Sequence, residues 1–216
     1  MKNEEHNEVL KLIRRGECDT VEFKRKTNHP EKIVREIVAF ANTGGGHLFI
    51  GVSDDGKPMG LNFPEEDEFV MNKAIGDLCR PTLDFQVDMV RFRDGVKILH
   101  YQIPDSTSKP HFAFLEKKHR YGKAFVRIDD KSVQASYEMR QILARNQKEQ
   151  SAIVFEESTR ELFKYFESHH SITLTTYRQL TGMNKRLASN KLISLALSGA
   201  LKIHPREGED VFIPVR

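Results

Sequence analysis

Residues 39–56 read AFANTGGGHLFIGVSDDG, and this stretch decides the fold. Its first residues complete a helix that begins at Pro30, where the missing N–H of proline costs nothing, and that carries an apolar stripe. The triple glycine ends this helix, and residues 47–52 are apolar enough to form a buried strand. The acidic pair and the glycine that follow signal a turn. The stretch therefore predicts a helix packed on a sheet.

A second stretch, GECDTVEFK at residues 16–24, alternates apolar and polar side chains as a strand does. Its valine and phenylalanine are predicted to point to one face, and Glu22 and Lys24 to the other. Glu17 stands five residues before Glu22. Charged side chains therefore crowd the ends of two predicted strands, and their role becomes the central functional question.

The predicted fold class is α+β, with a mixed β-sheet and packed helices in residues 1–146. Phe69 and Val70 are among the residues expected to face inward from a helix of this domain. The strands at 112–115 and 124–128 are expected to pair with each other across a basic loop. The helices and strands predicted around the first two stretches are 4–15, 65–79, 85–89, 96–103, 112–115, 124–128 and 137–146.

A smaller second domain is predicted over residues 152–216, after a polar linker at 147–151. Three helices joined by short turns come first, and two short strands around a charged turn come last. This order is typical of a winged helix. The predicted elements of this domain are 155–168, a helix near 176–180, 184–198, 201–204 and 211–215.

The composition limits the classes of protein that the chain can belong to. Hydrophobic residues make up 38% and charged residues 30% of the 216 residues, which describes a globular protein. No apolar run approaches the roughly 20 residues of a membrane helix, and the acidic start does not resemble a signal peptide. We therefore expect a cytoplasmic protein without a membrane partner. Cys18 and Cys79 lack the spacing of a zinc site or a disulfide framework.

The two opening stretches together resemble the AlbA-like domain of Schlafen-type proteins, over about residues 10–135. This family is associated with nucleic acid, and some members are RNA-cutting nucleases that use three acidic side chains. The resemblance implies that Glu17, Glu22 and Asp54 are the catalytic residues, and that Lys24 could contact a phosphate. Carboxylates are also the ligands that Mg²⁺ and Mn²⁺ prefer, so the same three would hold such a metal. Alternatively, Glu22 and Lys24 pair on a solvated strand face and Asp54 only shapes a turn.

The glycine turn allows two interpretations. Asn42, Gly44, Gly45 and Gly46 could present backbone N–H groups to a phosphate, as glycine-rich nests do. No Gly-Lys-Ser/Thr sequence follows, so there is no Walker A loop and ATP is not expected as a cofactor. The favoured interpretation is that the glycines let the chain pass from a helix into a central strand.

Positive charge gathers in the predicted loop at residues 117–123, together with the aromatic ring of Tyr121. Lysine and arginine release counterions when they contact phosphates, and an aromatic ring can stack on a base. Arg127 continues the positive charge on the following strand. The loop residues predicted to contact nucleic acid are Lys117, Lys118, Arg120 and Lys123.

In the second domain, Arg186, Asn190 and Ser194 recur at helical spacing opposite an apolar face. A recognition helix needs such a polar stripe to enter the major groove of DNA. Lys185 flanks the stripe and Arg206 lies on the predicted wing, so these two are also predicted to bind nucleic acid. The wing tip is acidic, however, and winged helices also serve as protein-interaction modules.

Two functional classes follow from these observations. The first is a nucleic-acid-binding protein, a transcriptional regulator that places a winged helix on DNA. The alternative is a metal-dependent endoribonuclease that cuts structured RNA through Glu17, Glu22 and Asp54. Animal Schlafen cores hold two AlbA-like lobes and a zinc site, whereas this chain has one lobe and too few cysteines. A homodimer that rebuilds a two-lobed groove is therefore expected.

Overall fold

The computed structural model describes residues 2–115, 121–145 and 156–215, with the side chains of the first helix described from residue 7 onward. The chain forms two compact units, Met1–Gln134 and Ala135–Arg216. Helices and strands occur together in both units, so the predicted α+β class is confirmed.

The first unit is built around a four-stranded sheet in the order β1-β2-β5-β4. β1 and β2 run parallel because α2 crosses between them, and the other neighbours are antiparallel, so the sheet is mixed as predicted. Its elements are α1 (Lys2–Arg15), β1 (Val21–Lys24), α2 (Pro30–Asn42), β2 (Gly46–Ile50), α3 (Pro64–Leu78), β3 (Cys79–Arg80), β4 (Gln86–Arg91), β5 (Lys97–Ile103), β6 (Phe112–Ala113), β7 (Phe125–Ile128) and β8 (Lys131–Gln134).

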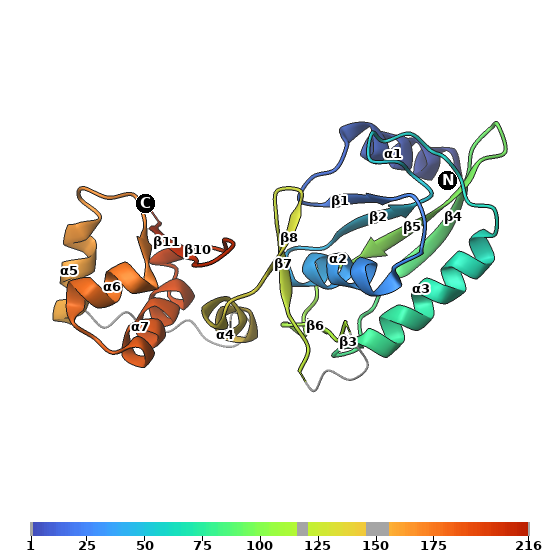
Figure 1. Ribbon diagram of the computed structural model, residues 1–216. Coiled ribbons are helices and arrows are strands. Elements are labelled where there is room, and N and C mark those ends of the chain that lie inside the picture. The colour runs from blue at the N-terminus through green and yellow to red at the C-terminus, as the bar shows by residue number, and fades with distance from the viewer. Residues whose placement is uncertain (1, 116–120, 146–155, 216) are drawn as a thin grey trace. The chain divides into compact units, whose positions relative to one another are not determined.

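Helices cover both faces of this sheet (Figure 1). On one face α1 packs on Phe23 and Phe49 through Val9 and Ile13. On the other face α2 and α3 pack on residues such as Leu48. Because successive strand residues point to opposite faces, the side chain of Glu22 lies on the α2 side, opposite to that of Phe23.

Two details of the first unit differ from the sequence prediction. Among the described residues, no strand pairing joins the segments 112–115 and 124–128. β6 pairs with β3 and β7 pairs with β8, and Ala113 forms an isolated bridge with Lys123, just before the second segment. Phe69 and Val70 lie on the outer face of α3, where they are exposed. The inner face of α3 is formed instead by Met71, Ala74 and Ile75.

The second unit consists of helices and a small antiparallel sheet in the order β10-β11-β9. The predicted order of three helices and a terminal hairpin is present, and the strand β9 joins the hairpin. Asn184 caps α7 by accepting a hydrogen bond from the Leu187 N–H at 3.0 Å. The elements are α4 (Tyr137–Arg145), α5 (Glu157–Tyr165), β9 (Ile172–Thr173), α6 (Leu174–Thr181), α7 (Lys185–Leu197), β10 (Leu201–His204) and β11 (Val211–Pro214).

Helix α4 belongs to the second unit, whereas the sequence analysis placed it at the end of the first domain. Ile142 of α4 lies in the same core as Leu162 and Leu192. The Ser189 hydroxyl of α7 donates a hydrogen bond to the Glu138 carboxylate of α4 at 2.5 Å. The boundary between the units therefore falls before α4, and the predicted linker at 147–151 lies outside the described residues. In the described part of the chain, no helix has both the length and the apolar character needed to span a bilayer.

Candidate functional site

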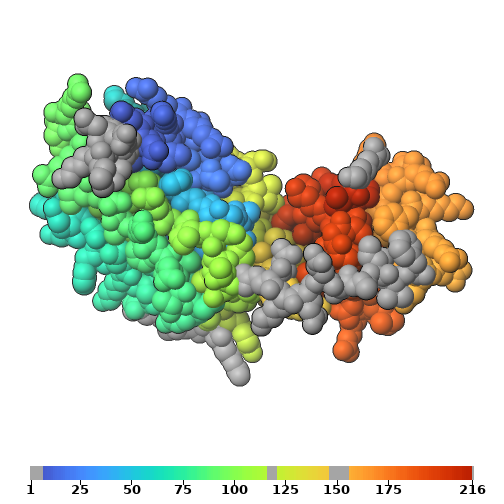
Figure 2. All heavy atoms as spheres, turned by 180° about the vertical axis from the view of Figure 1, so that it is seen from behind, coloured from blue at the N-terminus to red at the C-terminus, as the bar shows by residue number. Residues whose placement is uncertain are grey.

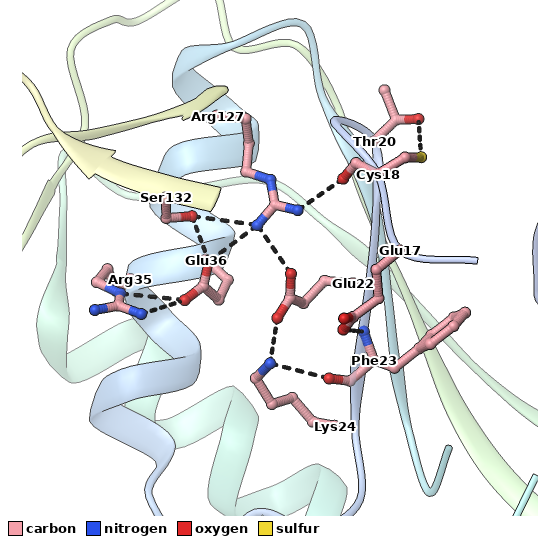
Figure 3. A network of polar contacts seen from close by, with 10 residues as sticks. All are labelled: Glu17, Cys18, Thr20, Glu22, Phe23, Lys24, Arg35, Glu36, Arg127 and Ser132. Carbon is pink, nitrogen blue, oxygen red and sulfur yellow. Dashed lines mark hydrogen bonds and ion pairs between the residues drawn. The ribbon is translucent and has the colours of Figure 1, made fainter. Parts of the chain in front are cut away.

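A buried arginine, Arg127, forms hydrogen bonds with two acidic residues of the first unit, Glu22 and Glu36 (Figure 3). The Arg127 Nη1 atom of β7 donates hydrogen bonds to Glu22 Oε2 at 2.9 Å and to Glu36 Oε2 at 3.1 Å. Its Nη2 atom donates to the Cys18 carbonyl oxygen at 2.7 Å. The guanidinium also lies over the Phe40 ring, 4.8 Å from its centroid, in a cation–π contact. Arg127 thus joins β1, α2 and β7 from within.

The prediction that Arg127 contacts nucleic acid is wrong in this structure. Its side chain has no exposed surface, and its guanidinium neutralises two carboxylates inside the unit. A charge buried in a protein interior requires such partners because it has lost its hydration. The sequence pattern showed an arginine on a strand but could not show which face of that strand is covered.

Glu22 is paired with two cations rather than one. Besides Arg127, it accepts a hydrogen bond from the Lys24 ammonium, which also donates to the Phe23 carbonyl at 2.9 Å. Burial raises the pKa of Glu22, and the hydrogen bond and charge of Lys24 act in the opposite direction. The expected Glu22–Lys24 pair is therefore present, but Glu22 is buried and does not lie on a solvated face.

Glu36 is a member of this network that the sequence analysis missed. It receives hydrogen bonds from Arg35 Nε at 3.1 Å and Nη2 at 2.8 Å, and another from the Ser132 hydroxyl. A signal was present in the sequence, because Glu36 lies one helical turn from Ile33 and Phe40, on the apolar stripe of α2. A charge at such a position indicates a buried partner.

Glu17 and Asp54 lie in different environments. Glu17 Oε1 accepts a hydrogen bond from the Phe23 N–H at 2.9 Å, so this carboxylate supports the backbone of β1. Asp54 is exposed in the turn after β2. Among the described residues, no three His, Cys, Asp or Glu side chains gather closely enough to hold a metal ion. The trio Glu17, Glu22 and Asp54 therefore does not fit a Mg²⁺ or Mn²⁺ site in this structure.

The polar groups of the glycine turn are used inside the fold. The Asn42 amide donates to the carbonyl oxygens of His111 at 3.0 Å and Phe125 at 2.9 Å, and it accepts from the His111 N–H at 2.8 Å. The Gly44 N–H donates to Asp105 Oδ1, and the Gly45 N–H donates to the Phe40 carbonyl, both at 2.9 Å.

The packing around Gly46 points the same way. A methyl group on Gly46 would lie 2.3 Å from the Phe40 ring. The arrangement favours the packing interpretation of Asn42, Gly44, Gly45 and Gly46 over the phosphate nest, because the donors of a nest must be free to bind an anion.

Of the four loop cations predicted to contact nucleic acid, only Lys123 lies among the described residues. Lys117, Lys118 and Arg120 lie outside the described residues. The side chain of Lys123 is exposed, while its backbone pairs with Ala113. Lys123 therefore remains available for contact with an anion, and the other three stay predictions.

In the second unit, the predicted polar stripe of α7 is exposed. Arg186, Asn190 and Ser194 face solvent, and Lys185 beside them does so too. The opposite face of α7 is buried, as expected from its apolar residues, which are Ala188, Leu192 and Leu195. Helix α7 therefore exposes its cationic and amide side chains to solvent, while its opposite face packs in the core of the second unit.

The stripe borders a cavity of about 640 Å³. Besides α7, the cavity is lined by α4, α6 and the turn between β10 and β11. Arg178 of α6 contributes a third cation beside Lys185 and Arg186. The sequence analysis did not identify Arg178, because its place near α7 depends on how α6 packs.

Two acidic residues of the turn between β10 and β11, Glu209 and Asp210, accept hydrogen bonds from other groups. The Ser136 hydroxyl donates to Asp210 Oδ2 at 2.5 Å, and Glu209 Oε1 accepts from the Thr175 N–H at 2.7 Å. Asp210 Oδ1 also accepts from the Arg206 N–H at 3.2 Å, while the Arg206 side chain is exposed. Burial raises the pKa of Asp210. Two acids of the turn therefore form hydrogen bonds within their own unit, but these neutral donors do not cancel the negative charge expected from the sequence.

The fold and residues of the first unit define a mixed α+β domain with an internal ionic network. The family model described as "Schlafen, AlbA_2" matches residues 17–136, which is more than half of the chain. The chain belongs to this family. The expected resemblance is thereby confirmed, and the membership favours nucleic-acid binding.

Two solved structures are similar to parts of the chain. One is the N-terminal domain of a putative ATP-dependent DNA helicase RecG-related protein from Nitrosomonas europaea, with 21% identity and a TM-score of 0.44, covering 61% of this chain and 93% of that one. The other is the DIP2311 protein from Corynebacterium diphtheriae, with 16% identity and a TM-score of 0.46, covering 91% of this chain. This chain spans only 34% of the Corynebacterium protein. No curated protein matches the chain at a significant level.

Proposed function

We propose that this protein binds nucleic acid, and that its second unit binds duplex DNA through α7 as part of a transcriptional regulator. The observation that carries the proposal is the exposed stripe of Arg186 and Asn190 on a helix whose opposite face is buried. Membership of the Schlafen, AlbA_2 family supports nucleic acid as the class of partner.

The topology of the second unit supports the DNA-binding role. The order α5, β9, α6, α7, β10, β11, with a three-stranded antiparallel sheet, resembles that of a winged helix and supports this proposal. In this class the helix that corresponds to α7 enters the major groove, and the turn between the last two strands contacts the flanking backbone. Arg206 lies on that turn with an exposed side chain.

The chemistry of the stripe suits both parts of DNA recognition. An arginine can donate two hydrogen bonds to guanine, and an asparagine can bind adenine in the same bidentate manner. Lys185 and Arg178 stand beside these residues and would neutralise phosphates. We therefore assign base reading to Arg186 and Asn190, and backbone contacts to Lys185, Arg178 and Arg206.

Replacing Arg186 by alanine is expected to weaken binding to the preferred DNA sequence by about 1–3 kcal/mol, because one bidentate base contact is lost. Binding to random duplexes should weaken by less. The preferred sequence would first be selected from a random duplex pool with the full chain. Fluorescence anisotropy at several salt concentrations then gives both affinities. Lys202→Ala, an exposed lysine on β10, is the matched control. An equal loss on all duplexes would contradict base reading by Arg186.

The first unit is assigned to assembly or sensing, and the endoribonuclease alternative has a direct test. With Mn²⁺ present, we expect that the protein does not cleave structured RNA by a reaction that requires Asp54. The reason is that, among the described residues, the three carboxylates do not form a group that could hold a metal ion. Asp54→Asn is the informative variant, since Asp54 is exposed and its replacement leaves the buried network intact. Cleavage by the full chain that disappears in Asp54→Asn would overturn this assignment and establish the nuclease.

A further inference from the structure

The outward face of α3 exposes two large apolar side chains, and a third stands just before the helix. Phe69 is 69% exposed and Val70 is 40% exposed, and Phe63, which precedes the helix, is 64% exposed. Figure 2 shows the turquoise atoms of α3 at the surface of the first unit. A contiguous exposed apolar patch marks an interaction surface, whereas single exposed apolar residues are common on any protein.

The exposure does not reflect a loosely attached helix. The inner residues Met71, Ala74 and Ile75 are buried in the core of the unit. The Tyr101 hydroxyl of β5 donates to Asn72 Oδ1 at 3.1 Å, and the Thr27 hydroxyl donates to Asp67. Helix α3 is thus held from its inner side, and its outer side chains stand on a fixed support.

The outer face has a pattern that complements itself. Glu66, Phe69, Val70 and Lys73 follow one another at spacings of three, one and three residues, so they share one face. If two copies of this helix lie antiparallel with the twofold axis between positions 69 and 70, Phe69 of one copy meets Val70 of the other. In the same register, Glu66 of one copy meets Lys73 of the other.

The same register also matches large and small residues. Phe63 falls opposite Gly76 of the second copy, since both lie equally far from the axis along the chain. A methyl group built on Gly76 meets no atom within 4 Å, so the surface there is open. A glycine at this exposed helical position leaves room for the ring of Phe63. Shape and charge therefore agree on one register.

We propose that the outward face of α3 is the surface through which two copies of this chain associate, with their α3 helices antiparallel about positions 69 and 70. A twofold contact uses the same patch on both subunits, which is what a self-complementary pattern provides. The apolar centre and the charged rim correspond to the anatomy of specific interfaces.

Charge argues for a second copy rather than nucleic acid on this face. The first turn of α3 carries Glu65, Glu66 and Asp67, which would repel phosphates. Within the described residues, Glu66 and Lys73 make no ion pair in their own chain, so both charges can serve a partner. The proposal does not rest on DNA binding by α7, and the two can be tested separately.

Sedimentation velocity of the full chain, from low to high micromolar concentration, tests the proposal. The wild type is expected to reach twice the 24.9 kDa mass of one chain. Phe69→Glu is expected to raise the dissociation constant at least about a hundredfold, because it places a charge at the centre of the apolar contact. Circular dichroism establishes that the variant remains folded, which its exposed position predicts.

A charge-reversal cycle tests the register itself. Glu66→Lys and Lys73→Glu should each weaken association about tenfold, because each creates two like-charge contacts across the axis, and the double reversal should restore it. Glu161→Lys, an exposed glutamate on α5, should change nothing. A wild type that stays monomeric, or a dimer that tolerates Phe69→Glu, overturns the proposal. Single reversals without effect, or a double variant that fails to recover, overturn the antiparallel register.

Discussion

Replacing Arg127 by methionine is expected to lower the free energy of unfolding by about 3–5 kcal/mol, which is typical of removing one partner from a buried ion pair. Methionine keeps much of the volume of the side chain but removes the charge. Glu22 and Glu36 would then stay buried beside each other with less compensation, although Lys24 and Arg35 remain bound to them. The Cys18 carbonyl would also lose its donor.

Urea denaturation followed by circular dichroism measures this loss. Lys123→Met is the matched control, because Lys123 is an exposed cation near the same strand, and its replacement should change stability by less than about 0.5 kcal/mol. If Arg127→Met were as stable as the wild type, the network would not support the fold.

The stability lost in Arg127→Met is expected to depend on pH. Burial already raises the pKa of Glu22 above its ordinary value of 4.5, so the folded chain keeps this proton at pH values where the unfolded chain has released it. The contribution of Glu22 to stability is thus fully present below its ordinary pKa and is lost as pH rises through the raised value. Removing a nearby cation raises the pKa of Glu22 further. The deficit should therefore be smallest below about pH 4 and grow toward neutral pH.

Replacing Gly45 by alanine is expected to cost about 2–4 kcal/mol, because strain and steric overlap act together. Gly45 has a φ angle of +83°, and its new methyl group would lie 2.7 Å from the Ile103 carbonyl oxygen and 2.8 Å from the Asp105 nitrogen. These are backbone atoms of β5 and the segment after it, so they cannot rotate away as a side chain can.

Gly44→Ala separates the two contributions. Gly44 has nearly the same φ angle, +85°, but a methyl group there meets no atom within 4 Å. It should therefore cost only about 1–2 kcal/mol, from the left-handed conformation alone. Thermal unfolding of both variants provides the comparison. Equal losses would show that the turn does not need the close approach of Gly45 to β5.

The local elements of this protein were determined by the sequence itself. Pro30 and the triple glycine delimit α2 and lead into β2 because proline and glycine restrict or free the backbone wherever they stand. The hairpin around Gly95 joins β4 and β5, and the outward stripe of α7 follows from the spacing of its polar and apolar residues. Such features depend on neighbours within one or two turns of the chain.

Only the tertiary structure decided which of these surfaces are covered. Arg127 and Glu36 occur in ordinary strand and helix patterns, yet they meet because β7 packs against α2. Phe69 fits the apolar periodicity of α3, but Met71 occupies the inner face and leaves Phe69 outside. Burial depends on contacts between segments far apart in the sequence. Hydrophobic periodicity indicates that a helix has an apolar face, but it does not show which other segment covers that face.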